Sequence, residues 1–154
     1  MSSASLSEES GQVALSVSDQ LRGKHILITG VTGFVGKVFL TMIAAHSPGV
    51  RKISVLIRSN RRGDANDRFE REVRSSEPFK AVETLIDGQS ESGDFARWVH
   101  EKIYPVTGDI TRGQLGLSDE NYRHLTIEDP LELIIHCAGN VNFDPPLNEA
   151  LEVN

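Results

Sequence analysis

The chain has 154 residues, which suits one domain with a sizeable core, and its net charge of −6 argues against nucleic acid as the main partner. Its apolar residues, 38% of the total, lie in short runs, none near the roughly 18 residues of a membrane span. A single cysteine excludes an internal disulfide, and the five histidines lack the spacing of metal ligands. We therefore expect a cytoplasmic protein with no metal site and no integral membrane span in this segment.

The N-terminal residues are rich in Ser and Glu and lack both a basic start and a long apolar stretch. This composition fits neither a secretory signal nor an Arg-rich transit peptide. We expect residues 1–20 to be a disordered Ser-rich tail and residues 21–154 to form the folded domain.

Three glycines lie three residues apart between a predicted strand and a predicted helix. The strand is His25–Thr29, a β-branched run typical of a parallel strand that is covered on both faces. Beyond the glycines, apolar residues recur at helical spacing, and we expect them to form one apolar stripe along a helix. The residues of this stripe are Val35, Val38, Phe39, Met42 and Ile43.

Each glycine has a physical role at such a junction. Gly30 permits a tight exit from the strand, Gly33 lets the backbone approach a pyrophosphate, and Gly36 lets helix and strand pack closely. The free N–H groups and positive dipole end of the helix then attract phosphate. The pattern indicates a dinucleotide site, although a turn that serves only the fold is the alternative. The candidate cofactor-binding residues here are Gly30, Thr32, Gly33, Phe34, Val35 and Gly36.

The end of the second predicted strand, Ile53–Ile57, indicates which cofactor binds. NAD-selective enzymes usually carry an acid there, whereas an arginine accommodates the 2′-phosphate of NADP. Between residues 51 and 63 the chain has five basic residues and no acid. Arg58, together with Arg61 or Arg62, makes a plausible clamp for this phosphate, so we predict NADPH as the cofactor. The alternative is a solvated basic loop.

Residues 59–102 are too many for a simple connection between strands. We expect extra helices, one around residues 65–75 and others before Ile103, with a loop at 88–93. Ile103–Thr107 is the third predicted strand, and it tolerates Pro105 near its start or at a sheet edge.

Gly108-Asp109-Ile110 follows the third strand at the rim where ligands bind in parallel sheets. Asp109, with Ile110 beside it, could reach an adenine; the equally weighted alternative is that Asp109 caps a turn. Residues 119–126 are typical of a helix with Ser118 as its N-cap.

The fourth predicted strand, Leu131–His136, leads into Cys137, Ala138 and Gly139. Small residues at this strand end leave room for the nicotinamide half of a cofactor, so these three join the candidate cofactor site. No base is identifiable beside Cys137, which favours a packed residue over a nucleophile, and we expect His136 to be structural. The whole pattern predicts an α/β fold: the amino-terminal half of a Rossmann-type doubly wound parallel sheet, in strand order 3-2-1-4, with a helical insertion after the second strand.

Four motifs carry a family resemblance. They are Thr-Gly-x-x-Gly-Phe-x-Gly, Leu-Ile-Arg, Gly-Asp-Ile, and Cys-Ala-Gly-Asn-Val-Asn-Phe followed by Leu147, Ala150 and Asn154. From about Leu21 to Asn154 the chain resembles the extended short-chain dehydrogenases/reductases, and more narrowly the fatty acyl-CoA reductases and the thioester reductase domains of carboxylic acid reductases.

The resemblance implies NADPH-dependent hydride delivery to a fatty acyl-CoA or other acyl thioester, giving an aldehyde and, in alcohol-forming members, a fatty alcohol. It also implies a catalytic Tyr with a Lys four residues later, but Tyr104 is followed at that offset by Gly108 and Tyr122 by Thr126. Asn154 matches the family position that supports the proton relay. We therefore expect the amino-terminal, cofactor-binding portion of a longer reductase, inactive alone.

Two other functions stay open from the sequence. The first is a nucleotide-sugar epimerase or dehydratase of the same fold, against which the basic segment at Arg58 and the long insertion count. The second is a non-catalytic NADP-binding module.

Overall fold

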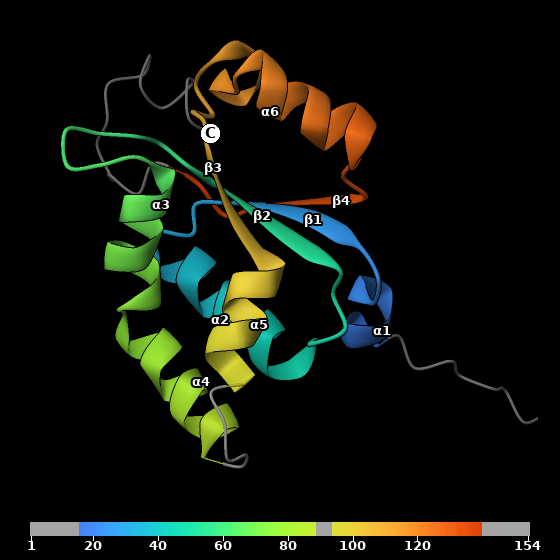
Figure 1. Ribbon diagram of the computed structural model, residues 1–154, viewed down its shortest axis with the longest axis vertical. Coiled ribbons are helices and arrows are strands. Elements are labelled where there is room, and N and C mark those ends of the chain that lie inside the picture. Colours follow the sequence, from blue (N-terminus) through green and yellow to red (C-terminus); the bar gives the residue numbers. More distant parts are fainter. Residues whose placement is uncertain (1–15, 89–93, 140–154) are drawn as a thin grey trace, which may run out of the picture.

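Four parallel strands form one sheet in the order β3-β2-β1-β4 (Figure 1). The computed structural model describes residues 16–88 and 94–139. Each neighbouring pair of strands runs parallel, which confirms the predicted Rossmann-type α/β fold and strand order. The strands are β1 (His25–Thr29), β2 (Lys52–Ile57), β3 (Ile103–Thr107) and β4 (Leu133–His136).

The two central strands are covered on both faces. Every residue of β1 is buried, and in β2 only Lys52 is partly exposed. Continuous apolar runs form such strands because both faces meet other elements. In the described sheet β3 and β4 are the edge strands. Pro105 lies in β3, as predicted. Because β3 is an edge strand, the missing N–H of Pro105 does not interrupt the hydrogen bonds between central strands.

The fourth strand begins at Leu133 and not, as predicted, at Leu131. The N–H of Leu131 donates to the carbonyl of Leu125 (3.0 Å), so this residue still belongs to the turn that leaves the preceding helix. The N–H of Glu132 then donates to the carbonyl of His25 (2.9 Å) and aligns the chain with β1.

Helices cover both faces of the sheet (Figure 1). Helices α2, α4 and α5 lie against one face, and α6 with its extension η3 lies over the other. The predicted insertion after β2 is confirmed, since α3, η1, α4 and α5 all precede β3; of the predicted loop, residues 89–93 lie outside the described residues. These elements are α2 (Phe34–His46), α3 (Ala65–Arg68), η1 (Phe69–Arg74), α4 (Glu77–Asp87), α5 (Asp94–Lys102), α6 (Asp119–Arg123) and η3 (His124–Glu128).

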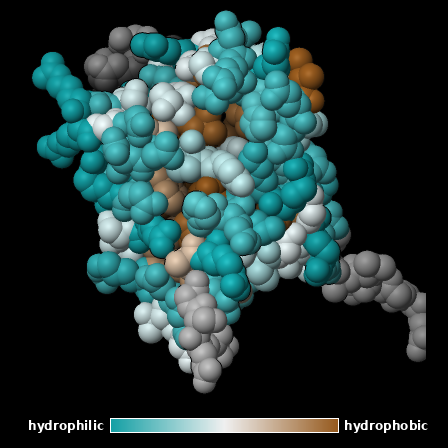
Figure 2. Space-filling view, in the orientation of Figure 1, coloured by the Kyte–Doolittle hydropathy of each residue, from teal (hydrophilic) through white to brown (hydrophobic). Residues whose placement is uncertain are grey.

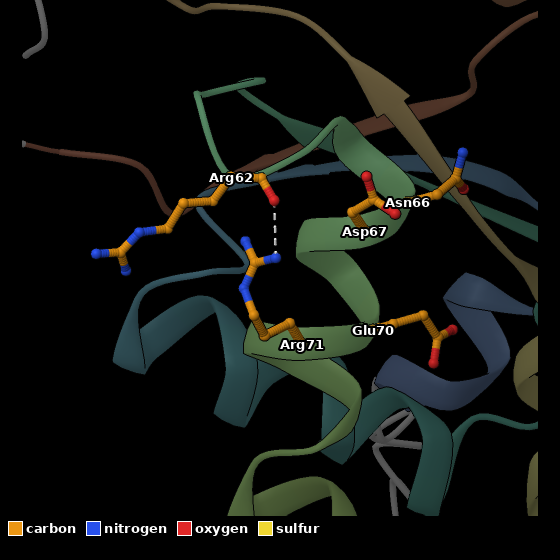
Figure 3. Close-up of a pocket in the computed structure, with 5 residues that line it drawn as sticks. All are labelled: Arg62, Asn66, Asp67, Glu70 and Arg71. Carbon is orange, nitrogen blue, oxygen red and sulfur yellow. Dashed lines mark hydrogen bonds between the residues drawn. The ribbon is translucent and has the colours of Figure 1, made fainter.

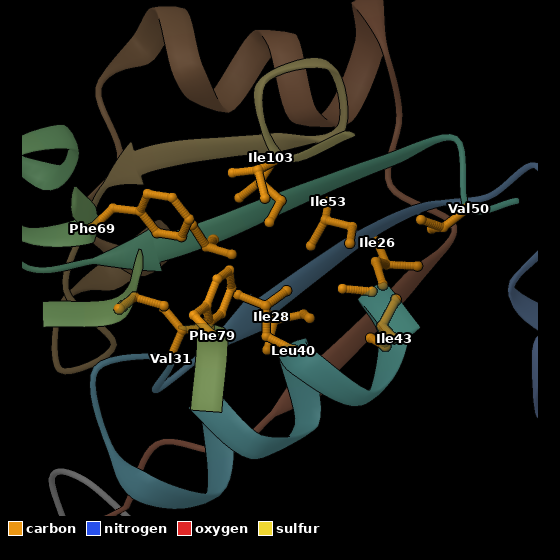
Figure 4. Packing of buried hydrophobic residues seen from close by; sticks show 14 of the residues in the cluster. Ile26, Ile28, Val31, Leu40, Ile43, Val50, Ile53, Phe69, Phe79 and Ile103 are labelled. Atoms are coloured by element: carbon orange, nitrogen blue, oxygen red, sulfur yellow. The ribbon is translucent and has the colours of Figure 1, made fainter. Parts of the chain in front are cut away.

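Three phenylalanines join the inserted helices to the core of the domain. The rings of Phe69 and Phe79 meet edge to face at 6.2 Å between centroids, and those of Phe79 and Phe95 lie 5.8 Å apart. All three are buried in one cluster with Ile28 of β1 and Leu40 of α2. Figure 4 shows Phe69 and Phe79 in this cluster. The insertion therefore belongs to the same hydrophobic core as the sheet.

The face that α2 turns to the sheet differs from the predicted stripe. Val35 and Met42 are 63% and 53% exposed, whereas Gly36, Leu40 and Ile43 are buried. The buried face of the helix includes Gly36, where a Cβ would meet the backbone of Gly30 and Val31, the two residues after β1. Only part of the predicted stripe, Ile43 and the half-buried Phe39, reaches the core.

The structure also corrects the expected start of the folded domain. Residues 17–20 belong to helix α1 (Val17–Leu21), whose N-cap Ser16 accepts a hydrogen bond from the N–H of Asp19. Leu21 is buried in the core and anchors this helix. Residues 16–20 therefore do not belong to a disordered tail, and residues 1–15 lie outside the described part of the chain.

The surface in the view of Figure 2 is mostly hydrophilic, with apolar atoms in small patches. Within residues 16–88 and 94–139, no helix has both the length and the apolar content needed to cross a bilayer.

A polar network at the amino ends of β1 and β2 holds the segment after η3 against the sheet. The buried His25 contacts the carbonyl of Asp129 through Nδ1 (2.8 Å) and Ser54 Oγ through Nε2 (2.9 Å). The Asp129 carboxylate accepts from Arg51 (2.5 Å) and Lys52 (3.0 Å). Because Asp129 directly follows η3, these contacts tie that segment to β1 and β2.

Acid should weaken this network in a defined pH range. Burial opposes ionisation of Asp129, but hydrogen bonds from Arg51 and Lys52 outweigh it and lower its pKa from 3.8 to about 2. A carboxyl group whose pKa is lower in the folded than in the unfolded protein stabilises the fold at any pH above the unfolded-state pKa. This stabilisation is lost as the pH falls toward the folded-state pKa.

We therefore expect the free energy of unfolding to fall between about pH 4 and pH 2, by on the order of 2 kcal/mol from this group. In Asp129→Asn this component should be absent, whereas Asp119→Asn, at an exposed position of α6, should keep it. Urea unfolding at pH 5 and pH 3 measures the difference. Equal acid dependence in all three proteins would contradict a stabilising role for Asp129.

Candidate functional site

The glycine turn joins three chain segments at very short range. Gly30 has φ +75°, a left-handed conformation, and a Cβ there would lie 2.5 Å from the nitrogen of Ala138 and 2.6 Å from the carbonyl carbon of Cys137. A Cβ on Gly36 would lie 2.6 Å from the carbonyl carbon of Gly30. Both positions therefore need glycine for reasons of space, whereas the sequence analysis expected close packing at Gly36 and a tight exit from the strand at Gly30.

Gly33 has a different character. A Cβ there would meet only the carbonyl oxygen of Gly30, at 3.3 Å, and the residue is exposed. Its N–H donates to that same oxygen (3.0 Å), which closes the turn. A side chain at this position would therefore be less crowded than one at Gly30 or Gly36, although its Cβ would still press on a backbone oxygen.

The N-terminus of α2 is open to solvent. Gly33 is its N-cap, and among the described residues no side chain caps this end. The first intrahelical bond runs from Lys37 N–H to the Gly33 carbonyl (3.1 Å), so the N–H groups of residues 34–36 have no partner within the helix. Phe34 and Val35 are 80% and 63% exposed. Such an end attracts anions through its N–H groups and dipole.

The carboxyl ends of the parallel strands bring the other candidate residues to the same edge. Arg58 follows β2 and Asp109 follows β3, and the Arg58 guanidinium lies 4.0 Å from Oδ2 of Asp109. The Arg58 side chain is 70% exposed and able to meet a ligand. The structure thus places the predicted phosphate and adenine residues side by side.

Asp109 caps a turn, which was one of its two predicted roles. Its Oδ1 accepts hydrogen bonds from the N–H (3.0 Å) and hydroxyl (2.8 Å) of Thr111. These bonds, with a smaller effect of nearby Arg58, lower the pKa of Asp109 and keep the carboxylate charged. The other oxygen, Oδ2, faces the guanidinium of Arg58; Ile110, the next residue, is partly buried.

The turn after β4 is held by Thr29 at the end of β1. Cys137 N–H donates to the Thr29 carbonyl (3.2 Å), and Ala138 N–H reaches the Thr29 hydroxyl (3.4 Å). The same hydroxyl contacts Nδ1 of His136 at 2.7 Å, in keeping with a structural histidine. Gly139 follows at the surface. Asn154 lies outside the described residues.

The loop after β2 doubles back on itself. Asn60 and Gly63 exchange main-chain hydrogen bonds of 3.0 and 3.1 Å, and this turn presents exposed Arg61 and Arg62 at its tip. An open hollow of about 650 Å³ lies beside it, between the loop and the outer side of α3 and η1 (Figure 3). The hollow is lined by Arg62, Asn66, Asp67, Glu70 and Arg71.

Several residues that shape the site were missed by the sequence reasoning. A Cβ on Gly108 would lie 2.5 Å from Leu56 and 2.6 Å from the Leu115 carbonyl oxygen, so this glycine lets the turn after β3 close over the sheet. Arg68 and Glu72 form an ion pair of 2.7 Å near the basic loop. Their four-residue spacing in a helix was the available signal. Within the described residues, no group of His, Cys, Asp or Glu side chains is placed to hold a metal ion.

The steric difference between two of the glycines can be measured. We expect Gly36→Ala to lower the free energy of unfolding by roughly 1–3 kcal/mol, because the methyl group must push α2 away from the backbone of Gly30 and Val31. The matched change Gly33→Ala should cost less than about 1 kcal/mol. Thermal or urea unfolding of both variants tests this. A larger loss for Gly33→Ala would contradict the described packing.

Several known proteins are similar in sequence to this chain. A model of an NAD-binding family, described as male sterility protein, matches residues 28–154. A protein of Arabidopsis thaliana named probable fatty acyl-CoA reductase 5 is 32% identical over 134 residues, which are 87% of this chain and 26% of that protein. Fatty acyl-CoA reductase 1 of Mus musculus is 34% identical over 140 residues, covering 91% of this chain and 25% of its own.

A solved structure is also similar. The terminal R domain from the myxalamid PKS-NRPS biosynthetic pathway is 26% identical with a TM-score of 0.58, over 85% of this chain and 30% of that chain. The present chain spans about a quarter of the length of the two reductase relatives. The match to the family model covers most of the chain and includes the strand ends that form the site. The chain therefore belongs to the male sterility protein family of NAD-binding domains, in the fatty acyl-CoA reductase branch of the extended short-chain dehydrogenases/reductases.

Proposed function

We propose that this chain binds NADPH for a reductase that acts on fatty acyl thioesters such as fatty acyl-CoA. The observation that carries the proposal is the position of Arg58, exposed at the strand edge where α2 also opens its N-terminus. The names of the relatives support the thioester as substrate. Because the chain covers only part of those relatives, the activity of the whole protein rests on this proposal.

Each part of the cofactor has residues that fit it. The open N-terminus of α2 suits the pyrophosphate, and the close approach of Gly30 to Ala138 leaves backbone, not side chains, at the centre of the edge. Arg58, with Arg61, suits the 2′-phosphate. Asp109 and Ile110 suit the adenine. The turn of Cys137, Ala138 and Gly139 suits the nicotinamide half.

NADPH is preferred to NADH on electrostatic grounds. The 2′-phosphate carries negative charge, and the guanidinium of Arg58 can donate parallel charge-assisted hydrogen bonds to it. Asp109 is the acid nearest to Arg58 among the described ion pairs, but its Oδ1 is engaged by Thr111. A ribose diol of NADH offers Arg58 no matching charge.

In the proposed reaction the bound NADPH supplies the hydride. The residues of this chain bind and orient the cofactor at the sheet edge. Asn154 would support proton delivery to the developing alkoxide, as the matching family position does. We also infer a cytoplasmic location, where a lone cysteine stays reduced.

Replacing Arg58 tests the choice of cofactor. Arg58→Ala should weaken NADPH binding on the order of tenfold or more, because charge-assisted bonds contribute about 1.5–3 kcal/mol each. NADH binding should barely change. Arg97→Ala, which removes an exposed arginine of α5, should affect neither. Dissociation constants from fluorescence titration decide the matter, and equal losses for both cofactors would show that Arg58 supports the fold.

The substrate is tested in the full-length protein. We expect NADPH consumption with palmitoyl-CoA and none with a nucleotide sugar. Asn154→Ala should lower kcat by about 10² or more while the dissociation constant of NADPH stays the same. Turnover of the nucleotide sugar would overturn the thioester proposal in favour of an epimerase or dehydratase.

A further inference from the structure

The basic loop at residues 58–62 is held at both ends by arginines of the following helix. Arg68 Nη1 donates to the main-chain carbonyl of Arg58 at 2.5 Å. Arg71 Nη1 donates to the main-chain carbonyl of Arg62 at 3.0 Å, the bond drawn in Figure 3. Two cationic side chains thus hold the backbone of a segment that is itself cationic.

A single carboxylate, Glu72, holds both of these arginines. Its two oxygens accept from Nε (3.0 Å) and Nη2 (2.7 Å) of Arg68, a bidentate pair. Oε1 also accepts from Nη2 of Arg71 (3.2 Å). Hydrogen bonding from Arg68, more than any other cause, lowers the pKa of Glu72 to about 2, so the carboxylate is ionised at neutral pH.

Arg68 is therefore suited to hold other residues in place and not to contact the cofactor itself. Its side chain is only 15% exposed, and Nε, Nη1 and Nη2 are all engaged with Glu72 or the Arg58 carbonyl. On the other side, the carbonyl of Ile57 accepts from the N–H of Gly108 (3.2 Å). The carbonyl of Ile57, the last residue of β2, is thus held by Gly108 after β3, and that of Arg58 by Arg68 of α3. The exposed side chain of Arg58 projects from this fixed backbone.

We propose that Glu72 is a positioning residue that sets the selectivity for NADPH by holding the loop of Arg58 in its binding conformation through Arg68 and Arg71. The inference rests on the proposed role of Arg58 toward the 2′-phosphate. Ordering a loop before the ligand arrives removes an entropic cost from binding. Only the cofactor that touches this loop gains from that order.

The test compares two glutamates of the same π-helical turn. Glu72→Gln should weaken NADPH binding about three- to tenfold and leave NADH unchanged, because the neutral amide no longer holds two guanidinium groups. Glu70→Gln is the matched control: Glu70 pairs with Arg74 at 3.7 Å, is 63% exposed, and points away from the loop in Figure 3. It should change neither dissociation constant.

A double variant distinguishes the positioning role of Glu72 from the phosphate-binding role of Arg58. In an Arg58→Ala background, Glu72→Gln should cause no further loss of NADPH binding. An undiminished loss in that background would overturn the positioning role, since Glu72 would then act without Arg58. No effect of Glu72→Gln where Arg58→Ala is effective would refute the inference alone. No effect of Arg58→Ala would instead refute the proposed phosphate site.

Arg71→Met offers a second route should Glu72→Gln fail to fold. It releases only the Arg62 end of the loop and keeps the pair of Arg68 with Glu72. A selective weakening of NADPH, smaller than that of Arg58→Ala, supports the inference. Equal weakening of NADPH and NADH in a folded Arg71→Met protein contradicts it.

Discussion

Backbone contact at the first strand-to-helix turn determines where the rest of the structure can lie. Gly30 touches the turn after β4, and Gly36 touches Gly30. These contacts place the start of α2 beside the ends of β1 and β4 with no side chain between them. A positive helix end and the adjacent strand ends therefore share one small region. Any larger residue at Gly30 or Gly36 would separate the elements that form the edge.

The site combines two kinds of positive charge. At α2 the charge belongs to the backbone, and its direction is fixed once the helix is packed. At the loop after β2 it belongs to flexible arginines, so orientation must come from other contacts. Glu72 provides these by gathering Arg68 and Arg71, each of which holds a carbonyl of the loop. An acidic residue outside the contact region can thus favour the binding of a negatively charged ligand.

Charged groups have different roles at the amino and carboxyl ends of the strands. At the amino ends, Asp129 draws Arg51 and Lys52 together and ties η3 to the strands, so its ion pairs are satisfied within the fold. At the carboxyl ends, Arg58 and the N-terminus of α2 face solvent. The short ion pairs at the amino ends stabilise the domain, whereas Arg58, which meets Asp109 only at 4.0 Å and is 70% exposed, is available to a ligand. This division follows from the parallel strands, whose equivalent ends meet at one edge.

The sequence by itself determined the strands, their order, the inserted helices and the glycine turn, because continuous apolar runs, helical spacing and glycine each leave a local pattern. It also placed Arg58 and Asp109 at strand ends. Only the tertiary structure decided the face of α2, where Gly36 packs on the backbone of Gly30 while Val35 and Met42 are exposed. The start of β4 at Leu133 also depends on the tertiary structure, because the N–H of Leu131 still bonds to the carbonyl of Leu125 in the preceding turn. The link from Glu72 to the Arg58 loop likewise depends on carbonyl directions, which no residue pattern encodes.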